Sequence, residues 1–144
     1  MTIAELLECC GSTQWARTMA KSQPFENAES LFDHAERIWW SLDASDWLEA
    51  FRAHPKIGEA NTPEQAGIKS ADPLTREALS RVNEEYLAKF GYIFIVCATG
   101  KSGEEMLSLL QSRMQNDPDE ELRIAASEQS KITRLRLVKL ITSS

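Results

Sequence analysis

Two histidines occur in the 144-residue chain, and their neighbours differ. His34 lies among charged residues of a predicted helix, which is typical of a solvated surface position. His54 follows an amphipathic segment and precedes Pro55, which disfavours helical geometry at His54 and cannot donate to a helical ladder. A histidine at a helix end either interacts with the helix dipole or acts as an acid or base near neutral pH, and both interpretations stay open here.

A carboxylate and an amide follow shortly afterwards. Thr62 and Gln65 have the spacing of a capping box with Pro63 at the first helical position, which predicts that Glu64 and Gln65 occupy the first turn of a helix. Starting a helix is one interpretation of this pattern, and holding two polar groups rigidly for a ligand is the other. Nine residues, 55 to 63, separate His54 from Glu64, so the two side chains can share one pocket.

The third candidate is an arginine on the predicted last helix. Four-residue spacing places Ile132, Arg136 and Leu140 on one line, whereas Arg134 is in line with Ser130. We therefore expect Arg136 to face inward, where a guanidinium needs an anion or a carbonyl oxygen as its partner. The alternative is a surface arginine whose aliphatic stem covers apolar area.

Helix-starting signals recur along the whole chain and predict the elements that position these side chains. Helices are expected after Thr2, Ser12 or Thr13, Asn27, Asp43 or Ser45, Asp72, Ser102 and Asp117. No repeat or interdomain linker is visible. The pattern predicts an all-α fold, a single-domain bundle of about seven or eight helices over residues 1–144.

Residues 92–98 do not fit this helical pattern. They are β-branched and aromatic and are typical of a short buried strand, yet no convincing partner strand exists. A lone buried strand leaves backbone N–H and C=O groups without partners. The segment is therefore either helical against its propensity or extended, and in the second case its backbone groups can serve a polar ligand.

Composition and charge exclude several classes of function. The net charge is −6 and no Lys/Arg block occurs, which disfavours nucleic acid and anionic membranes as partners. The longest apolar run, residues 93–98, is too short to span a bilayer, and the N-terminus lacks the features of a secretory signal, so we expect a cytoplasmic protein.

Metal, thiol and phosphate chemistry are also disfavoured. Two distant histidines and no acidic triplet at ligand spacing predict no metal site. Three cysteines without a CxxC motif predict buried, reduced thiols. Residues 99–103 end like a phosphate-binding loop but lack its first glycine, so this match is taken as accidental.

Several stretches together resemble the 2-oxo-4-hydroxy-4-carboxy-5-ureidoimidazoline (OHCU) decarboxylases, most of all the decarboxylase domain of plant-type allantoin synthase. They are residues 9–12, 46–51, 53–58, 64–65, 89–95 and 128–137. The resemblance implies an all-α carboxy-lyase of urate degradation that uses no cofactor, forms a homodimer and converts a small-molecule ureide into (S)-allantoin. It also implies functional coupling to a 5-hydroxyisourate hydrolase.

The same resemblance assigns roles to residues. It makes His54 the catalytic general acid, with Glu64 binding the substrate and assisting proton movement. The substrate-binding set that it implies is Pro55, Asn61, Thr62, Pro63, Glu64, Gln65, Phe94, Ile95, Val96, Cys97, Ala98 and Arg136. The sequence departs from the family pattern in two ways: Asn61 stands where a serine is usual, and the stretch between His54 and Glu64 is shorter than is common.

Two alternatives remain open, and one of them belongs to a different functional class. Asn61 keeps open an enzyme of the same fold that decarboxylates a related ureide. Composition and periodicity also permit a non-catalytic helical interaction domain whose apolar faces bind a partner.

Overall fold

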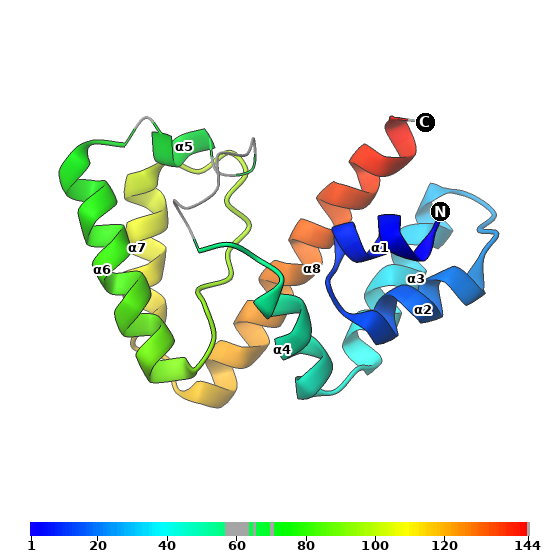
Figure 1. Cartoon of the computed structure of the whole chain (residues 1–144), viewed down its shortest axis with the longest axis horizontal. Helices are drawn as coiled ribbons and strands as arrows, with labels where there is room; N and C mark the ends of the chain where they lie inside the picture. The colour runs from blue at the N-terminus through cyan, green and yellow to red at the C-terminus, as the bar shows by residue number, and fades with distance from the viewer. Residues whose placement is uncertain (57–63, 65, 70, 144) are drawn as a thin grey trace. The chain divides into compact units, whose positions relative to one another are not determined.

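The computed structural model describes residues 1–56, 64, 66–69 and 71–143, and these residues form eight helices without a strand (Figure 1). The all-α prediction and the expected number of helices are confirmed. The helices are α1 (Ile3–Cys9), α2 (Thr13–Ser22), α3 (Ala28–Ser41), α4 (Ala44–Arg52), α5 (Ala66–Lys69), α6 (Pro73–Phe90), α7 (Gly103–Arg113) and α8 (Pro118–Thr142).

Side-chain caps define most of the helix starts, as the sequence predicts. Thr2 and Ser102 each form a complete capping box, in which the hydroxyl accepts from a backbone N–H and a glutamate returns to the cap backbone. Five further helices have a cap side chain that accepts from the backbone N–H of the third residue that follows; these caps are Ser12, Asn27, Asp43, Asp72 and Asp117. Gly91 ends α6 in the left-handed conformation, with φ of 83°.

The chain divides into two compact units. The first comprises residues 1–53 and 129–144, and therefore α1 to α4 with the C-terminal part of α8. Helix α2 packs against α1, α3 and α4. Its fully buried Trp15 donates from Nε1 to the Ala35 carbonyl oxygen at 3.0 Å, so the largest apolar side chain of this core is also fixed in orientation.

The second unit comprises residues 54–128, with α5, α6, α7 and the N-terminal part of α8. Helices α6 and α7 pack against each other, and Leu79, Met106 and Leu110 are buried. Unlike the first core, this unit also buries a charged pair, Arg113 and Glu121. That pair is the feature on which the candidate site depends.

Helix α5 lies against the start of α7, and this approach requires a glycine. A Cβ atom added at Gly67 would lie 2.0 Å from the carbonyl oxygen of Lys101, which is far below any van der Waals contact. The backbone after Glu64 is thereby brought directly onto the turn that precedes α7.

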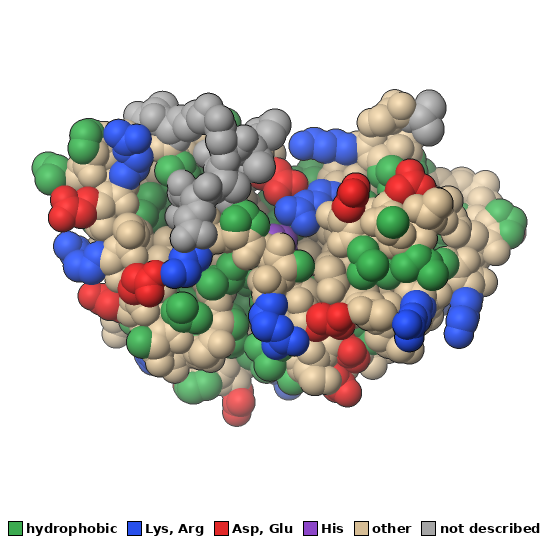
Figure 2. All heavy atoms as spheres, viewed as in Figure 1, with side chains coloured by type: hydrophobic (Ala, Val, Ile, Leu, Met, Phe, Trp, Pro, Cys, Tyr) green, Lys and Arg blue, Asp and Glu red, His purple; other side chains and the backbone are tan. Residues whose placement is uncertain are grey.

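Neither the described helices nor the face shown in Figure 2 has the features of a membrane span or of a large basic patch. None of the described helices combines the length and the apolar character that crossing a bilayer requires. Acidic and basic side chains are intermixed over the face shown in Figure 2. This mixed surface matches the lack of a Lys/Arg block in the sequence.

Candidate functional site

The strand-like segment of the sequence, residues 92–98, is neither helix nor strand in the structure. It forms an irregular stretch between α6 and α7 in the chain (Figure 1), and Phe94, Ile95, Val96, Cys97 and Ala98 are all buried. A buried backbone without helix or sheet must find other hydrogen-bond partners. Residues 92–98 are called the buried segment below, and their backbone partners show how the site is built.

An arginine of α7 holds the middle of the buried segment. Arg113 donates from Nη1 to the Ile95 carbonyl oxygen at 2.6 Å, and its guanidinium lies over the Phe94 ring at 4.5 Å from the ring centre. Arg113 is only 7% exposed, so these contacts are made out of water, where a charged hydrogen bond is strong. The arginine thus fixes both the backbone and a side chain of the segment.

Arg113 is in turn neutralised by Glu121 of α8, which is fully buried. The guanidinium donates to Oε2 of Glu121 from Nη2 at 2.6 Å and from Nε at 2.8 Å. Asn116 donates to Oε1 at 3.0 Å, and the Tyr86 hydroxyl donates to Oε2. Burial, followed by this bond to Glu121, holds the pKa of Tyr86 well above its usual range, so Tyr86 stays a donor. The buried carboxylate therefore has donors on both oxygens.

Two side chains of opposite charge hold the backbone of Cys97, two residues after Ile95. Glu128 of α8 accepts from the Cys97 N–H at 3.0 Å, and Lys101 donates from Nζ to the Cys97 carbonyl oxygen at 2.7 Å. Both backbone groups of Cys97 are therefore bound by charged side chains rather than by a neighbouring strand. Lys101 lies in the stretch whose likeness to a phosphate loop was taken as accidental, and in the structure it holds protein backbone.

Val96, between these two anchored residues, is different. Among the residues that the structure describes, none accepts a hydrogen bond from the Val96 N–H or donates one to its carbonyl oxygen. Val96 is only 5% exposed, and a buried donor and acceptor without partners are costly. Protein side chains therefore bind the backbone on both sides of Val96, whereas the backbone groups of Val96 itself are suited to a ligand.

The predicted acid–base residues lie at the beginning of the same unit. His54 is half-buried immediately after the end of α4, whose last helical residue is Arg52, and Pro55 beside it is exposed. Glu64 is half-buried two residues before α5. His54, Glu64 and the buried segment thus belong to one unit. The predicted residues Asn61, Thr62, Pro63 and Gln65 lie outside the described residues.

Arg136 belongs to the first unit, so its convergence with the other candidates stays a prediction. It is half-buried on α8, whereas Arg134 is exposed, which agrees with the expected choice between the two. Arg136 donates from Nη1 to the Glu8 carbonyl oxygen at 3.3 Å. The expected kind of partner, a carbonyl oxygen, is therefore present.

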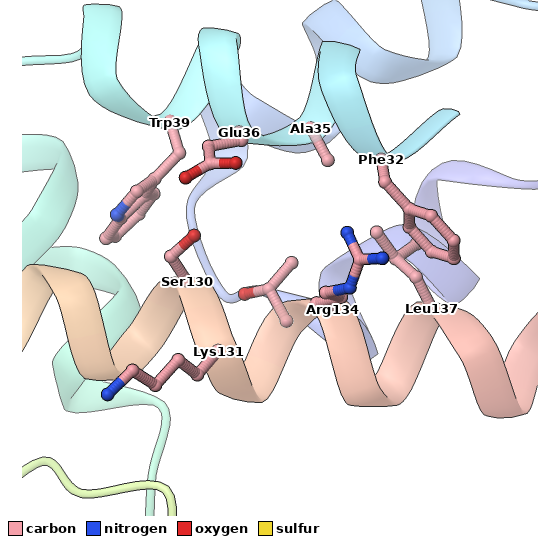
Figure 3. A pocket seen from close by; sticks show the side chains of 9 residues that line it. Phe32, Ala35, Glu36, Trp39, Ser130, Lys131, Arg134 and Leu137 are labelled. Atoms are coloured by element: carbon pink, nitrogen blue, oxygen red, sulfur yellow. The ribbon is translucent and has the colours of Figure 1, made fainter. Parts of the chain in front are cut away.

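A small pocket in the first unit contains none of the predicted site residues. It has a volume of about 140 Å³ and lies between α3 and α8. Figure 3 shows Arg134 beside Phe32 at one end and Glu36, Ser130 and Trp39 toward the other. The Arg134 guanidinium lies 4.3 Å from the centre of the Phe32 ring. Because α8 residues two apart point to opposite sides, this pocket is separate from the surroundings of Arg136.

The three cysteines are free and buried, as predicted. Burial raises the pKa of Cys9 to about 11 and that of Cys10 to about 12. These two thiols therefore remain protonated near neutral pH and are poor nucleophiles. Among the described residues, no group of three or more His, Cys, Asp or Glu side chains is arranged to hold a metal ion.

The side chains that hold the buried segment are not among the residues predicted from the sequence; they are Lys101, Arg113, Glu121 and Glu128. A signal existed for Arg113, because it continues the apolar line of Met106 and Leu110 on α7 and so had to face the core. For Glu121 and Glu128 no local signal existed, since their most distant partners are 35 and 31 residues away in the chain. The partner of Lys101 is only four residues away, but it lies in an irregular stretch whose backbone direction no periodicity predicts.

Comparison with protein families gives one match over almost the whole chain. The family model described as OHCU decarboxylase matches residues 2–138. The bifunctional uric acid degradation protein TTL of Arabidopsis thaliana is 38% identical over 93% of this chain, which spans only 45% of that protein. The 2-oxo-4-hydroxy-4-carboxy-5-ureidoimidazoline decarboxylase of Xenopus laevis is 28% identical over 96% of this chain and 85% of its own length.

Solved structures agree. A crystal structure of OHCU decarboxylase in the presence of (S)-allantoin matches with a TM-score of 0.91 and 40% identity, covering 96% of this chain and 97% of that one. A crystal structure of (S)-allantoin synthase matches with a TM-score of 0.77 at 21% identity, over 95% of this chain and 48% of that one, and supports the fold alone.

Proposed function

The chain belongs to the OHCU decarboxylase family, a family of carboxy-lyases, and on that premise we propose that it converts OHCU into (S)-allantoin. The observation that carries the proposal is the near-complete match, at 40% identity, to an OHCU decarboxylase whose crystal structure was obtained with (S)-allantoin. The lone buried segment adds independent support, because it offers backbone groups to a polar ring.

The substrate itself can accept the electrons that decarboxylation releases. OHCU carries its carboxylate on a ring carbon that also bears a hydroxyl, next to a C=N bond. When the carbon–carboxylate bond breaks, its electron pair forms a ring C=C bond, the C=N electrons move to nitrogen, and that nitrogen takes a proton. A second proton then goes to the neighbouring carbon while the hydroxyl becomes a carbonyl. The protein has to orient the carboxylate, stabilise the developing charge and protonate one face.

His54 is the proposed donor of the proton that sets the handedness of the product. An imidazole has an ordinary pKa of about 6.5, so both of its protonation states are accessible near neutral pH. Glu64 is the proposed neighbour that favours the charged imidazolium, since an ionised carboxylate close by stabilises a cation. Both residues are half-buried, which leaves each within reach of a bound molecule.

The ring is proposed to lie against the buried segment. The Val96 N–H and carbonyl oxygen offer a donor and an acceptor side by side, which complements the N–H and C=O groups of a ureide. In the proposal Arg136 adds the guanidinium, whose planar fork suits a carboxylate or carbonyl group. Gln65 and the residues 61–63 complete the proposed substrate contacts.

Replacing His54 tests the mechanism. We expect His54→Ala to fold normally and to lose most of its turnover of freshly generated OHCU, because His54 is the proposed donor of the proton to one face. The measurement is the rate and the optical purity of allantoin formation, each corrected for the spontaneous reaction.

The other histidine supplies a matched control. His34 is half-buried in the first unit, where Nδ1 lies 2.8 Å from the Ser30 carbonyl oxygen and the ring meets the edge of Phe25. His34→Ala should keep the wild-type rate and product handedness. Near-wild-type turnover in His54→Ala would remove His54 from the mechanism, and a wild-type rate equal to the spontaneous background would refute the function itself.

The proposal extends to assembly and surroundings. We expect a homodimer in the cytoplasm, coupled functionally to a 5-hydroxyisourate hydrolase, since relatives in Arabidopsis thaliana and Bacillus subtilis are named bifunctional uric acid degradation proteins. Light scattering during gel filtration measures the oligomeric state, and a monomer at micromolar concentration contradicts the dimer.

A further inference from the structure

The buried segment is held at two individual residues, Ile95 and Cys97, and this arrangement differs from a sheet. In a sheet, a neighbouring strand binds the backbone along its whole length with many similar neutral hydrogen bonds. Here, Ile95 is bound through its carbonyl oxygen by Arg113, and Cys97 is bound through both backbone groups by Glu128 and Lys101. Each of these charged side chains therefore controls the position of the residue that it binds and of the neighbouring residues, including Val96.

The two charges on Cys97 act on both sides of one residue. Glu128 binds the amide that joins Val96 to Cys97, and Lys101 binds the carbonyl group that follows. Hydrogen bonds to ionised groups are shorter and stronger than neutral ones. The peptide that carries the Val96 carbonyl group is the same peptide whose N–H donates to Glu128, so its plane is fixed by that bond.

Lys101 also meets the backbone that follows Glu64. Its carbonyl oxygen is so close to Gly67 that no side chain fits there, while its ammonium group holds Cys97. One residue thus contacts the helix after the proposed acid–base carboxylate and the segment proposed to bind the ring. Both contacts lie within the second unit.

We propose that Lys101 and Glu128 are positioning residues of this enzyme, which set the orientation of the Val96 backbone groups and thereby the face of the ring that receives the proton. The inference rests on the proposed function. Neither side chain needs to touch the substrate, because each acts through the Cys97 backbone.

Product handedness is the decisive readout. A loss of folded protein lowers the rate but leaves the product of each remaining active molecule unchanged. If the Val96 backbone groups are no longer held in one orientation, the ring can tilt, so that protonation occurs on both faces. The optical purity of the allantoin is measured at an enzyme concentration at which, for every variant, the catalysed rate exceeds the spontaneous rate.

Lys101→Met is the first variant, because the side chain is half-buried in a turn and its removal leaves the helices intact. We expect kcat/KM to fall about 10- to 100-fold, as for other small displacements of a bound group, together with a loss of optical purity. Lys101→Arg keeps a donor for the Cys97 carbonyl oxygen and should therefore retain much of the wild-type kcat/KM and optical purity. Lys139→Met, an exposed lysine on α8, is the control.

Glu128 is tested in the same way. Glu128→Ala should lower kcat/KM and optical purity about as much as Lys101→Met does. Glu128→Gln keeps a carbonyl oxygen for the Cys97 N–H, so both quantities should lie between those of Glu128→Ala and wild type. Glu120→Ala, an exposed glutamate at the start of the same helix, should leave optical purity unchanged. If Glu128→Ala fails to fold, Lys101→Met and Glu128→Gln still decide the question.

Amide hydrogen exchange gives a readout that needs no activity. Lys101→Met should speed exchange at Val96 and Cys97 while the amides in the middle of α6 keep their wild-type rates. Wild-type optical purity and unchanged exchange in Lys101→Met and Glu128→Gln would overturn the positioning role while leaving the decarboxylase function intact. A wild-type protein without turnover above background would instead refute the function, and the inference with it.

Discussion

The two units bury different kinds of side chain. In the first unit the fully buried residues are mainly apolar, with Trp15, Phe51 and Met19 among the largest. The second unit adds the ion pair of Arg113 and Glu121 to its apolar core. An apolar core tolerates adjustments, since dispersion and burial have no preferred direction. A buried ion pair is stabilising only in a narrow range of geometries. In this protein its arginine also binds the backbone of the segment proposed to contact the substrate.

The aromatic residues separate the units in the same way. All four tryptophans, Trp15, Trp39, Trp40 and Trp47, lie in the first unit, and both tyrosines, Tyr86 and Tyr92, lie in the second. Tryptophan fluorescence therefore reports on the first unit and tyrosine absorbance on the second. These two signals allow the comparison to be tested in the intact chain.

The largest expected effect comes from breaking the buried pair. Arg113→Met leaves Glu121 buried without its cation, and we expect the free energy of unfolding to fall by about 3 to 5 kcal/mol. Urea unfolding followed by tyrosine absorbance and by tryptophan fluorescence measures it, and the tyrosine signal should change first. Adding Glu121→Leu should recover much of the loss, because the unpaired charge is then gone.

A matched control and a contrary result complete this test. Arg123→Met removes an exposed arginine of α8 and should change stability by no more than about 0.5 kcal/mol. If Arg113→Met were as stable as Arg123→Met, the ion pair would not hold the second unit together.

A more gradual effect is expected at alkaline pH. Burial raises the pKa of Cys10 from 9.0 to about 12 and the pKa of Tyr92 from 10.0 to about 12. A group whose pKa is raised by folding stabilises the folded state fully below its unfolded pKa, and this contribution is lost as pH rises toward the folded pKa. Stability should therefore decline from about pH 9 in the first unit, and tyrosine ionisation should contribute only from about pH 10 in the second.

Unfolding measured at a series of pH values between 8 and 12 checks this order, with both optical signals recorded. Cys10→Ala removes the more deeply buried thiol and should make the decline in the tryptophan signal less steep, while Cys9, whose pKa burial raises to about 11, still starts the decline near pH 9. A decline that is equally steep with and without Cys10 would show that this thiol does not contribute to the alkaline loss of stability in the first unit.

The smallest effect is expected at the other arginine that meets an aromatic ring. Arg134 lies over Phe32, as Arg113 lies over Phe94, but Arg134 is exposed. An exposed cation–π contact contributes only about 0.5 to 1 kcal/mol, so Arg134→Ala should lower stability by no more than that and should leave OHCU turnover unchanged. A loss of turnover in Arg134→Ala would assign the first unit's pocket a role in the reaction.

Local features of the fold could be predicted from the sequence, because a cap and the helix it starts lie within four residues. Thr2 with Glu5 and Ser102 with Glu105 form the expected capping boxes, and Asp43 rather than Ser45 caps α4. The buried segment was recognised as unusual for the same reason, since its β-branched residues contradict their helical surroundings.

The partners of that segment could not be predicted. Glu128 reaches Cys97 across 31 residues and Tyr86 reaches Glu121 across 35, and such pairings follow from packing rather than from local pattern. The family resemblance predicts that these segments bind the substrate, which stays a prediction, and it does not predict the side chains that hold them. The approach of Arg136 to His54 and Glu64 stays a prediction.

Recognition through the main chain at Val96 has a consequence for how this protein can vary. An N–H and a carbonyl oxygen are common to nearly all amino acids, so codon changes at this position can alter the side chain without deleting either group. Proline is the exception, because it lacks the N–H. Among relatives, position 96 is therefore expected to tolerate exchange between apolar side chains of similar size, whereas loss of Arg113, Lys101 or Glu128, which hold its neighbours, is expected to be selected against.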